Sequence, residues 1–299
     1  MSWLQIRRSL GVLAPGLCLL ITSAAAPPRW GRTGHEITGR AAAAGLPAEM
    51  PEFFRNAGER LGWLNYEPDR WRDRRFRPME QAFSYDHYID IEIVPRAALE
   101  AADRFTYLAL LQRAGLAEPA REAGLLPFHI LELYGRLVTG FKRWRDEQDP
   151  QVKRWIEERV INDAGILGHY VADSANPHHT TVHFNGWAEG WHNPGGYTND
   201  RSFHARFESV FVDANVRFED VRPAVQRARL LEDVRAEVFA HLARVNGQVD
   251  RLYQLEKQEA FGENTRSPGH KAFAVERLAD GASLLRSIWW TAWNQSGQI

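Results

Sequence analysis

The distribution of hydrophobic and polar positions from residue 30 onward is mostly helical. Apolar residues recur at intervals of three and four, most clearly between residues 130 and 141, as they do along one face of an α-helix. Proline disfavours helix at the residue before it, so a helix entering the Asn176-Pro177 pair should end there. The pattern predicts helices over 36–44, 128–146, 151–173, 202–218, 222–255 and 271–292.

Strand patterns are rare in this chain. Residues 88–93 alternate apolar and polar side chains and are the one serious strand candidate, while 185–200 holds five glycines and prolines and is the longest expected loop. Neither an internal repeat nor a linker is evident. We therefore predict one mainly helical, all-α domain over residues 30–299.

Composition narrows the class of protein. The 299 residues are 44% hydrophobic and 25% charged, which is ordinary for a globular protein and excludes a disordered tail, a collagen-like fibre and a multi-span membrane protein. The formal net charge of −1 provides no overall basic field for a polyanion. With Cys18 as its single cysteine, the chain can form neither an intramolecular disulfide nor a cysteine-based zinc ribbon.

The first residues have the pattern of an export signal. Arg7 and Arg8 precede an apolar run over 10–21, and small residues follow at 23–26. We predict a signal peptide over 1–26 and a periplasmic or secreted protein with no integral membrane association after cleavage. An uncleaved N-terminal anchor is the alternative. Cleavage removes two arginines and no acid, which leaves a net charge of −3.

Histidines and acids at helical spacing suggest metal binding. His169 and Asp173 are four residues apart on a predicted helix, and His204 and Glu208 repeat the arrangement. One helical turn can bring such a nitrogen and oxygen to one zinc ion, although surface pairs of this kind are common by chance and for either pair alone that is the favoured interpretation. Further candidate ligands are His35, Asp73, His87, His178 and His179. Together these donors could hold several zinc ions.

Five motifs in order carry a family resemblance. They are Trp-Gly-x-x-Gly-His at 30–35, Trp-x-Asp at 71–73, His-Tyr-x-Asp at 87–90, His-x-x-x-Asp-x-x-x-Pro-x-His at 169–179 and His-x-x-x-Glu at 204–208. With them the chain resembles the superfamily that joins zinc-dependent phospholipases C with fungal-type single-strand-specific nucleases. The resemblance covers roughly residues 30–210.

The resemblance implies a helical hydrolase domain with three zinc ions. One zinc would be held by Asp73, His87, His169 and Asp173, with Asp173 bridging to the second. The second would also use His35 and the main chain of Trp30. The third would use His179, His204 and Glu208, with His178 as the alternative to His179. Asp73 and Asp173 would be the catalytic carboxylates around a metal-activated water that attacks phosphorus without a covalent enzyme intermediate.

Substrate contacts are less clearly marked. Arginines crowd Asp73, and Arg74 and Arg75 are either phosphate-binding residues or part of a solvated loop. Family nucleases carry an arginine three residues after the metal-binding aspartate, where this chain has Phe76. Tyr88 and Asp90 align with an aromatic residue and an acid that stack on and hydrogen-bond a base, although Asp90 could instead support His87.

The branch markers disagree. The short spacing from Trp30 to His35 is that of the nuclease branch, whereas glutamate at Glu208 resembles the phospholipase branch. We predict a zinc-dependent phosphodiesterase acting on single-stranded nucleic acid, with no stable protein partner. The alternatives are a phospholipase C that acts on phospholipid, and an exported protein that binds zinc without catalysis.

Overall fold

The computed structural model of the protein describes residues 31–299. The expected signal peptide over 1–26, Cys18 and the Trp30 ligand therefore lie outside the described residues. Within them the chain is mostly helical, with only isolated β-bridges, which confirms the all-α class. None of the helices described over 31–299 is both long and apolar enough to span a membrane.

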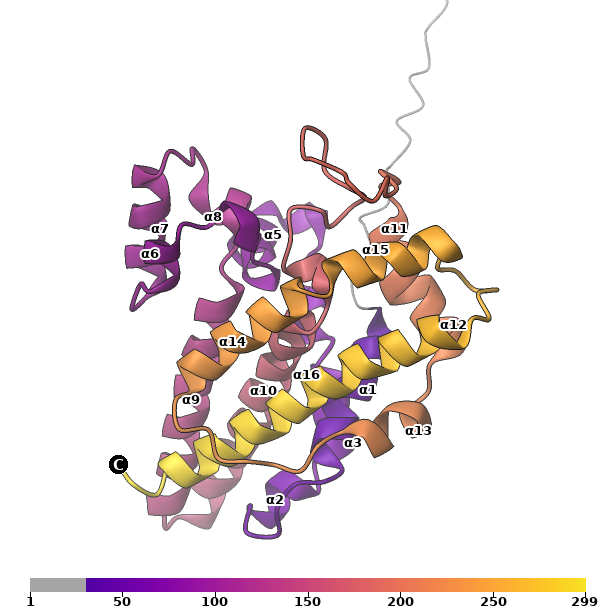
Figure 1. Ribbon diagram of the computed structural model, residues 1–299. Coiled ribbons are helices and arrows are strands. Elements are labelled where there is room, and N and C mark those ends of the chain that lie inside the picture. Colours follow the sequence, from indigo (N-terminus) through magenta and orange to yellow (C-terminus); the bar gives the residue numbers. More distant parts are fainter. Residues whose placement is uncertain (1–30) are drawn as a thin grey trace, which may run out of the picture.

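Seven helices form the body of the molecule. They are α1 (Arg32–Ala43), α3 (Gly58–Leu64), α9 (Leu126–Asp146), α10 (Pro150–Ser174), α14 (Val234–Asn246), α15 (Val249–Gln258) and α16 (Pro268–Gln295). In Figure 1, α16 runs diagonally across one face, with α14 and α15 above it. Helices α1, α3, α9 and α16 all pack against α10, so α10 is the centre of the bundle.

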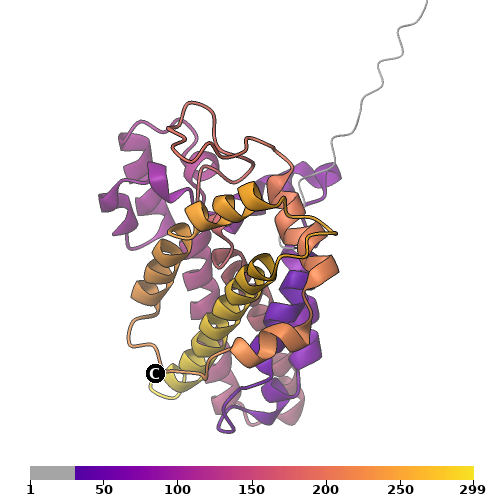
Figure 2. The same ribbon diagram turned by 45° about the vertical axis from the view of Figure 1, so that its right-hand side comes forward.

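The remaining helices are short. They are α2 (Glu52–Arg55), α4 (Glu67–Arg70), α5 (Arg77–Phe83), α6 (Arg96–Leu99), α7 (Arg104–Arg113), α8 (Pro119–Ala123), α11 (Phe203–Ala205), α12 (Val212–Asn215) and α13 (Phe218–Val221). Figure 2 shows α15 lying below the loop that follows α10, at the upper end of the bundle. This end holds the candidate site.

Helix α10 brings polar residues into the core. Its first turn is capped by Asp149, whose carboxylate accepts hydrogen bonds from two main-chain N–H groups, and Pro150 occupies the first helical position. The helix ends at Ser174, as the following Asn-Pro pair predicts. All residues from 163 to 174 are buried, so this half of the helix is surrounded by protein on every side. His169 and Asp173 are consequently fixed deep in the bundle.

Glycines let the helices around α10 approach closely. A Cβ on Gly165 would lie 2.3 Å from the Leu64 Cβ, and one on Gly168 would lie 2.3 Å from the Asn65 Nδ2. On α1, a Cβ on Gly39 would lie 2.9 Å from the Cα of Gly62. These contacts leave no room for a larger residue, and they allow Asn65 to enter the space between α1 and α10.

Most of the predicted helices are confirmed, and their bounds differ in instructive ways. The helices expected over 36–44, 128–146, 151–173 and 271–292 are present, the first of them ending at Ala43, and 185–200 is a loop. Residues 222–255 do not form one helix, because Pro223 interrupts the chain and Asp233 caps a new start by accepting a hydrogen bond from the Ala236 N–H. The helical segment expected over 202–218 ends at Asn215.

The strand expected over 88–93 is wrong. Only Ile89 forms a bridge, with Gly124, and a 3₁₀ turn begins at Ile91. The Ile89 N–H donates to the carbonyl of His179 (2.9 Å) and the Asp90 N–H to that of Ala123 (2.9 Å). The segment is extended because two other parts of the chain bind it from either side, so it is a strap across the site and not part of a sheet.

Candidate metal centre

Three groups of metal-binding side chains converge at the upper end of the bundle. Within each group, one donor atom per residue lies within 4.8 Å of the others. The groups are His35, His169 and Asp173; Asp69, His87 and His169; and His179, His204 and Glu208. Each group could hold a metal ion. Seven of the eight side chains are buried, and each group combines residues from segments far apart in the sequence.

The second group closes around the Asp173 carboxylate. His87 Nδ1 lies 2.9 Å from His169 Nε2 and 2.9 Å from Asp173 Oδ2, and the last two atoms are 3.3 Å apart. Four tetrahedral ligands about 2.0 Å from a zinc ion would be separated from one another by about 3.3 Å. The spacing of this triangle therefore suits a zinc-sized ion.

The other carboxylate oxygen of Asp173 faces the first group. Its Oδ1 lies 3.5 Å from His35 Nε2, and the rings of His35 and His169 stack with centroids 4.0 Å apart. Asp173 thus stands between the two groups and presents one oxygen to each. This is the bridging position that the resemblance assigns to it.

Main-chain and amide oxygens fix the protonation of three imidazoles. His169 Nδ1 donates to the carbonyl oxygen of Asn65 (2.7 Å), and His35 Nδ1 donates to the Oδ1 of the same residue (3.0 Å). His179 Nδ1 donates to the His87 carbonyl (2.6 Å). Because these oxygens only accept hydrogen bonds, the proton must sit on Nδ1, which leaves the Nε2 lone pair to bind a metal.

Burial keeps His35 neutral as well. Desolvation, reinforced by the neighbouring His169, lowers the pKa of His35 to about 4. A neutral imidazole is the form that ligates metals, so the site requires no proton loss from His35 near neutral pH. No other described atom accepts or donates a hydrogen bond at its Nε2.

The third group is built on a π-helical turn. Residues Arg206–Phe211 continue α11 with the wider π spacing, and Glu208 lies within this turn. Its Oε2 lies 2.9 Å from His204 Nε2 and 3.5 Å from His179 Nε2, and it accepts a hydrogen bond from Asn176 Nδ2 (2.9 Å). Turns of this kind are rare and often mark functional sites. The Glu208 carbonyl also accepts the N–H of Gly31 (3.1 Å).

Asp73 is not where the sequence analysis expected it. Among the described residues it joins none of the three groups, and Asp69 lies beside His87 and His169 instead. Asp73 caps the following 3₁₀ turn by accepting the Arg75 N–H (2.9 Å), and the Arg75 side chain also binds it. These hydrogen bonds lower the pKa of Asp73 to about 2. Its carboxylate is therefore engaged at the surface.

The expectation that the arginines next to Asp73 bind phosphate also changes. Arg75 has an 84% exposed side chain that is bound to Asp73, so it does not reach the metal-binding groups. The Arg74 side chain lies outside the described part of the structure. Arg72, in contrast, is only 17% exposed and lies 3.8 Å from the carboxylate of Asp69. Family nucleases carry an arginine three residues after the metal-binding aspartate. Counted from Asp69 that position is Arg72, whereas counted from Asp73 it is Phe76.

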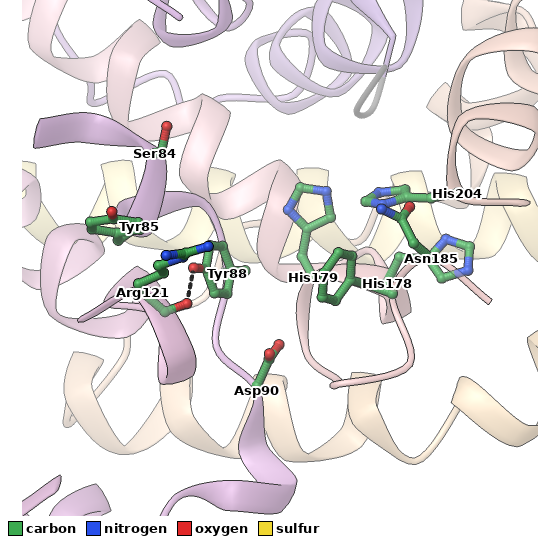
Figure 3. Close-up of a pocket in the computed structure, with 10 residues that line it drawn as sticks. Ser84, Tyr85, Tyr88, Asp90, Arg121, His178, His179, Asn185 and His204 are labelled. Atoms are coloured by element: carbon green, nitrogen blue, oxygen red, sulfur yellow. Dashed lines mark hydrogen bonds between the residues drawn. The ribbon is translucent and has the colours of Figure 1, made fainter. Parts of the chain in front are cut away.

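A cavity of about 290 Å³ opens beside the third group. Figure 3 shows His179 and His204 on one side of this cavity and Tyr88 on the other, with Asp90 between them. The Tyr88 hydroxyl donates to the main-chain carbonyl of Arg121 (2.5 Å), so its ring is fixed along the wall. Burial, with a contribution from Glu92, raises the pKa of Asp90 well above its usual range.

His178 is an alternative ligand that the structure places differently. Among the described residues it belongs to no donor group, and its buried ring packs edge-on against Phe203. Burial and the neighbouring His179 hold the pKa of His178 well below its usual value. The turn thus directs His179 toward Glu208 and leaves His178 as a cavity wall.

Sequence reasoning missed Asp69, Asn65 and Asn176. Asp69 lies two residues before Trp71, and Asp73 lies two residues after it, so both aspartates are equally close to this tryptophan in the sequence. Both asparagines lack any spacing signal, because they act on the ligands through hydrogen bonds and not as ligands. No protein-family model, curated protein or solved structure matches this chain. Inference about activity therefore rests on the residues themselves.

Proposed function

We propose that the protein is a zinc-dependent phosphodiesterase that cleaves single-stranded nucleic acid. The observation that carries the proposal is the convergence of three donor groups at one end of the bundle, two of them sharing His169, beside a cavity lined by His179 and His204. Nitrogen and carboxylate donors in this ratio suit zinc. The five motifs quoted above supply the family expectation. Export after removal of residues 1–26 belongs to the same proposal.

Zinc bound by these donors would lower the pKa of a bound water and polarise a phosphoryl oxygen. The protein's own part is to hold the donors rigidly. Asn65 fixes two imidazoles through one carbonyl and one amide oxygen, and Asn176 orients Glu208. Asp173 presents both its carboxylate oxygens to the ligand imidazoles and so keeps the first two groups in one arrangement. The catalytic role expected of Asp73 passes to Asp69.

Substrate contacts come from Arg72, which lies beside Asp69, and from residues that line the cavity. Arg72 lies beside Asp69 and supplies a guanidinium for the phosphate that is cleaved. Asp90, whose pKa is raised by burial, has an oxygen without a hydrogen bond among the described atoms, so this carboxyl group is available to hydrogen-bond a base edge. Tyr88 supplies an aromatic face for stacking. This combination favours a nucleotide over a phospholipid headgroup.

The test is hydrolysis by the purified protein of single-stranded DNA and of phosphatidylcholine vesicles. Each reaction is run with zinc, with a chelator, and with zinc restored after chelation. We expect zinc-dependent cleavage of the DNA. Zinc-dependent release of phosphocholine instead would assign the phospholipase C activity that Glu208 suggests. Three bound zinc ions without hydrolysis of either substrate would leave the non-catalytic zinc protein.

A further inference from the structure

Helix α8 brings one cation to the rim of the cavity. Of the described residues that line it, Arg121 alone carries a permanent positive charge. In Figure 3 its guanidinium lies near Tyr85 and Tyr88, across the cavity from His204. His179 and His204 of the third group therefore lie at one end of this cavity, and Arg121 lies at the other. The volume of about 290 Å³ is near the lower end of the size range for small-molecule sites.

The main chain of α8 is hydrogen-bonded to the strap over 88–93, which directly follows His87. The Tyr88 hydroxyl donates to the Arg121 carbonyl, and the Asp90 N–H donates to the Ala123 carbonyl (2.9 Å). Gly124 pairs with Ile89 directly after the helix. These hydrogen bonds are made by the main chain of α8 and the residue after it. They fix the position of the Arg121 backbone and leave the N–H donors of its guanidinium unused.

The guanidinium keeps most of its hydrogen-bonding capacity. Nη1 donates to the carboxylate of Glu118 (2.9 Å), and this is the one hydrogen bond recorded for the guanidinium among the described residues. Nε and Nη2 remain for an incoming anion, and a guanidinium binds phosphate through two such donors at once. Its side chain is 66% exposed, so a ligand can reach it without a rearrangement of the core.

We propose that Arg121 binds a second anionic group of the substrate, separate from the phosphoester that is cleaved. The inference deepens the proposed function and rests on it. A substrate with negative charge at both ends would span the cavity from the histidines to α8. The preferred class is then a phosphodiester carrying a further phosphate, as in a nucleotide chain, over a diester with a single charge.

The test is calorimetric binding of two probes to the zinc-loaded protein, thymidine 5′-monophosphate and thymidine 3′,5′-bisphosphate. We expect the bisphosphate to bind about fivefold more tightly, since an exposed charge-assisted contact is weakened by water. Arg121→Gln should reduce this ratio to about one, and Arg121→Lys should restore part of it. Glu118→Gln should raise the ratio, because it removes the competing carboxylate.

The matched control is Arg96→Gln. Arg96 also pairs with a nearby glutamate on a short helix, Glu100 at 3.6 Å, but it does not line the cavity. This variant should keep the wild-type ratio. Circular dichroism and thermal melting establish that the Arg121 variants are folded, which the retained backbone hydrogen bonds of α8 lead us to expect.

The inference is overturned if the wild-type protein binds neither probe, binds both equally, or keeps its preference in Arg121→Gln. Failure of this inference can be distinguished from failure of the proposed function. Hydrolysis of single-stranded DNA without any bisphosphate preference would refute the Arg121 assignment alone. A bisphosphate preference that depends on Arg121, without hydrolysis, would refute the proposed function alone.

Discussion

Replacing Asp69 and Asp73 separately by asparagine distinguishes the ligand that the structure indicates from the one that the sequence motif indicates. The two substitutions remove the same charge four residues apart in the chain. Asp69 joins His87 and His169 in a donor group, whereas Asp73 binds Arg75 at the surface. We therefore expect Asp69→Asn to lose one of three zinc ions and Asp73→Asn to keep all three.

The size of the effect follows from metal-site energetics. Loss of an outer hydrogen-bonding partner typically weakens metal binding by 10- to 100-fold, and loss of a charged ligand should weaken it by at least about 100-fold. At saturating zinc this removes about 2.7 kcal/mol of stabilisation of the folded state. For a chain of this size, that corresponds to a fall in Tm of about 4–5 °C.

The assay is zinc content by mass spectrometry after dialysis against a weak chelator, together with thermal melting with and without added zinc. Asp73→Asn should melt close to the wild-type temperature under both conditions. The reasoning is refuted if Asp73→Asn loses zinc while Asp69→Asn retains it. It is also refuted if both variants keep three ions with unchanged affinity.

Three further predictions follow from individual buried groups. Asp173→Asn should reduce zinc-dependent hydrolysis by at least about 100-fold, and initial rates at saturating zinc check this. Burial lowers the pKa of His241 to about 4. As pH falls, the unfolded chain therefore takes up a proton at this histidine before the folded protein does. The contribution of His241 thus makes the folded state less stable as pH drops from about 6.5 to 4. In metal-free protein, the unfolding free energy of His241→Leu should fall by up to about 3 kcal/mol less than that of the wild type over this pH range. Urea titrations at each pH measure this difference. Arg286 is buried and donates to three main-chain carbonyls, so Arg286→Met should cost about 3 kcal/mol in unfolding free energy, whereas the exposed Arg229→Met should cost little.

Local periodicity was sufficient for the long helices and for the two ligand pairs on helical turns. His169 and Asp173 come together because one turn of α10 aligns them, and His204 and Glu208 likewise follow one another along a helical segment. Such pairs depend on contacts within a single turn. Spacing alone is therefore enough to predict them.

The choice between Asp69 and Asp73 was beyond the sequence motif. Each lies two residues from Trp71, so spacing alone cannot separate them. Asp69 lies on the short helix α4, where Pro68 stands in the first turn and the backbone directs the carboxylate inward. Asp73 follows the end of that helix and caps the next turn toward solvent. Only the path of the chain in space decides which aspartate reaches His87.

The roles of Asn65 and of the strap over 88–93 depend on packing between distant segments. Asn65 reaches His35 and His169 because Gly39 and Gly168 leave room for it, and no pattern around residue 65 contains that information. The strap has the alternation of a strand, yet its partners are loop carbonyls. At the strap, tertiary contacts overrode the local preference for a strand.

Asp173 faces both of the first two donor groups, with Oδ1 toward His35 and Oδ2 toward His87, and this makes those groups a single thermodynamic unit. An ion that binds to one group aligns the common carboxylate for the other. By reciprocity the second ion must then tighten the binding of the first to the same degree. The group of His179, His204 and Glu208 shares no residue with this pair. Stepwise chelation should accordingly remove two ions cooperatively and the remaining ion in a step of its own.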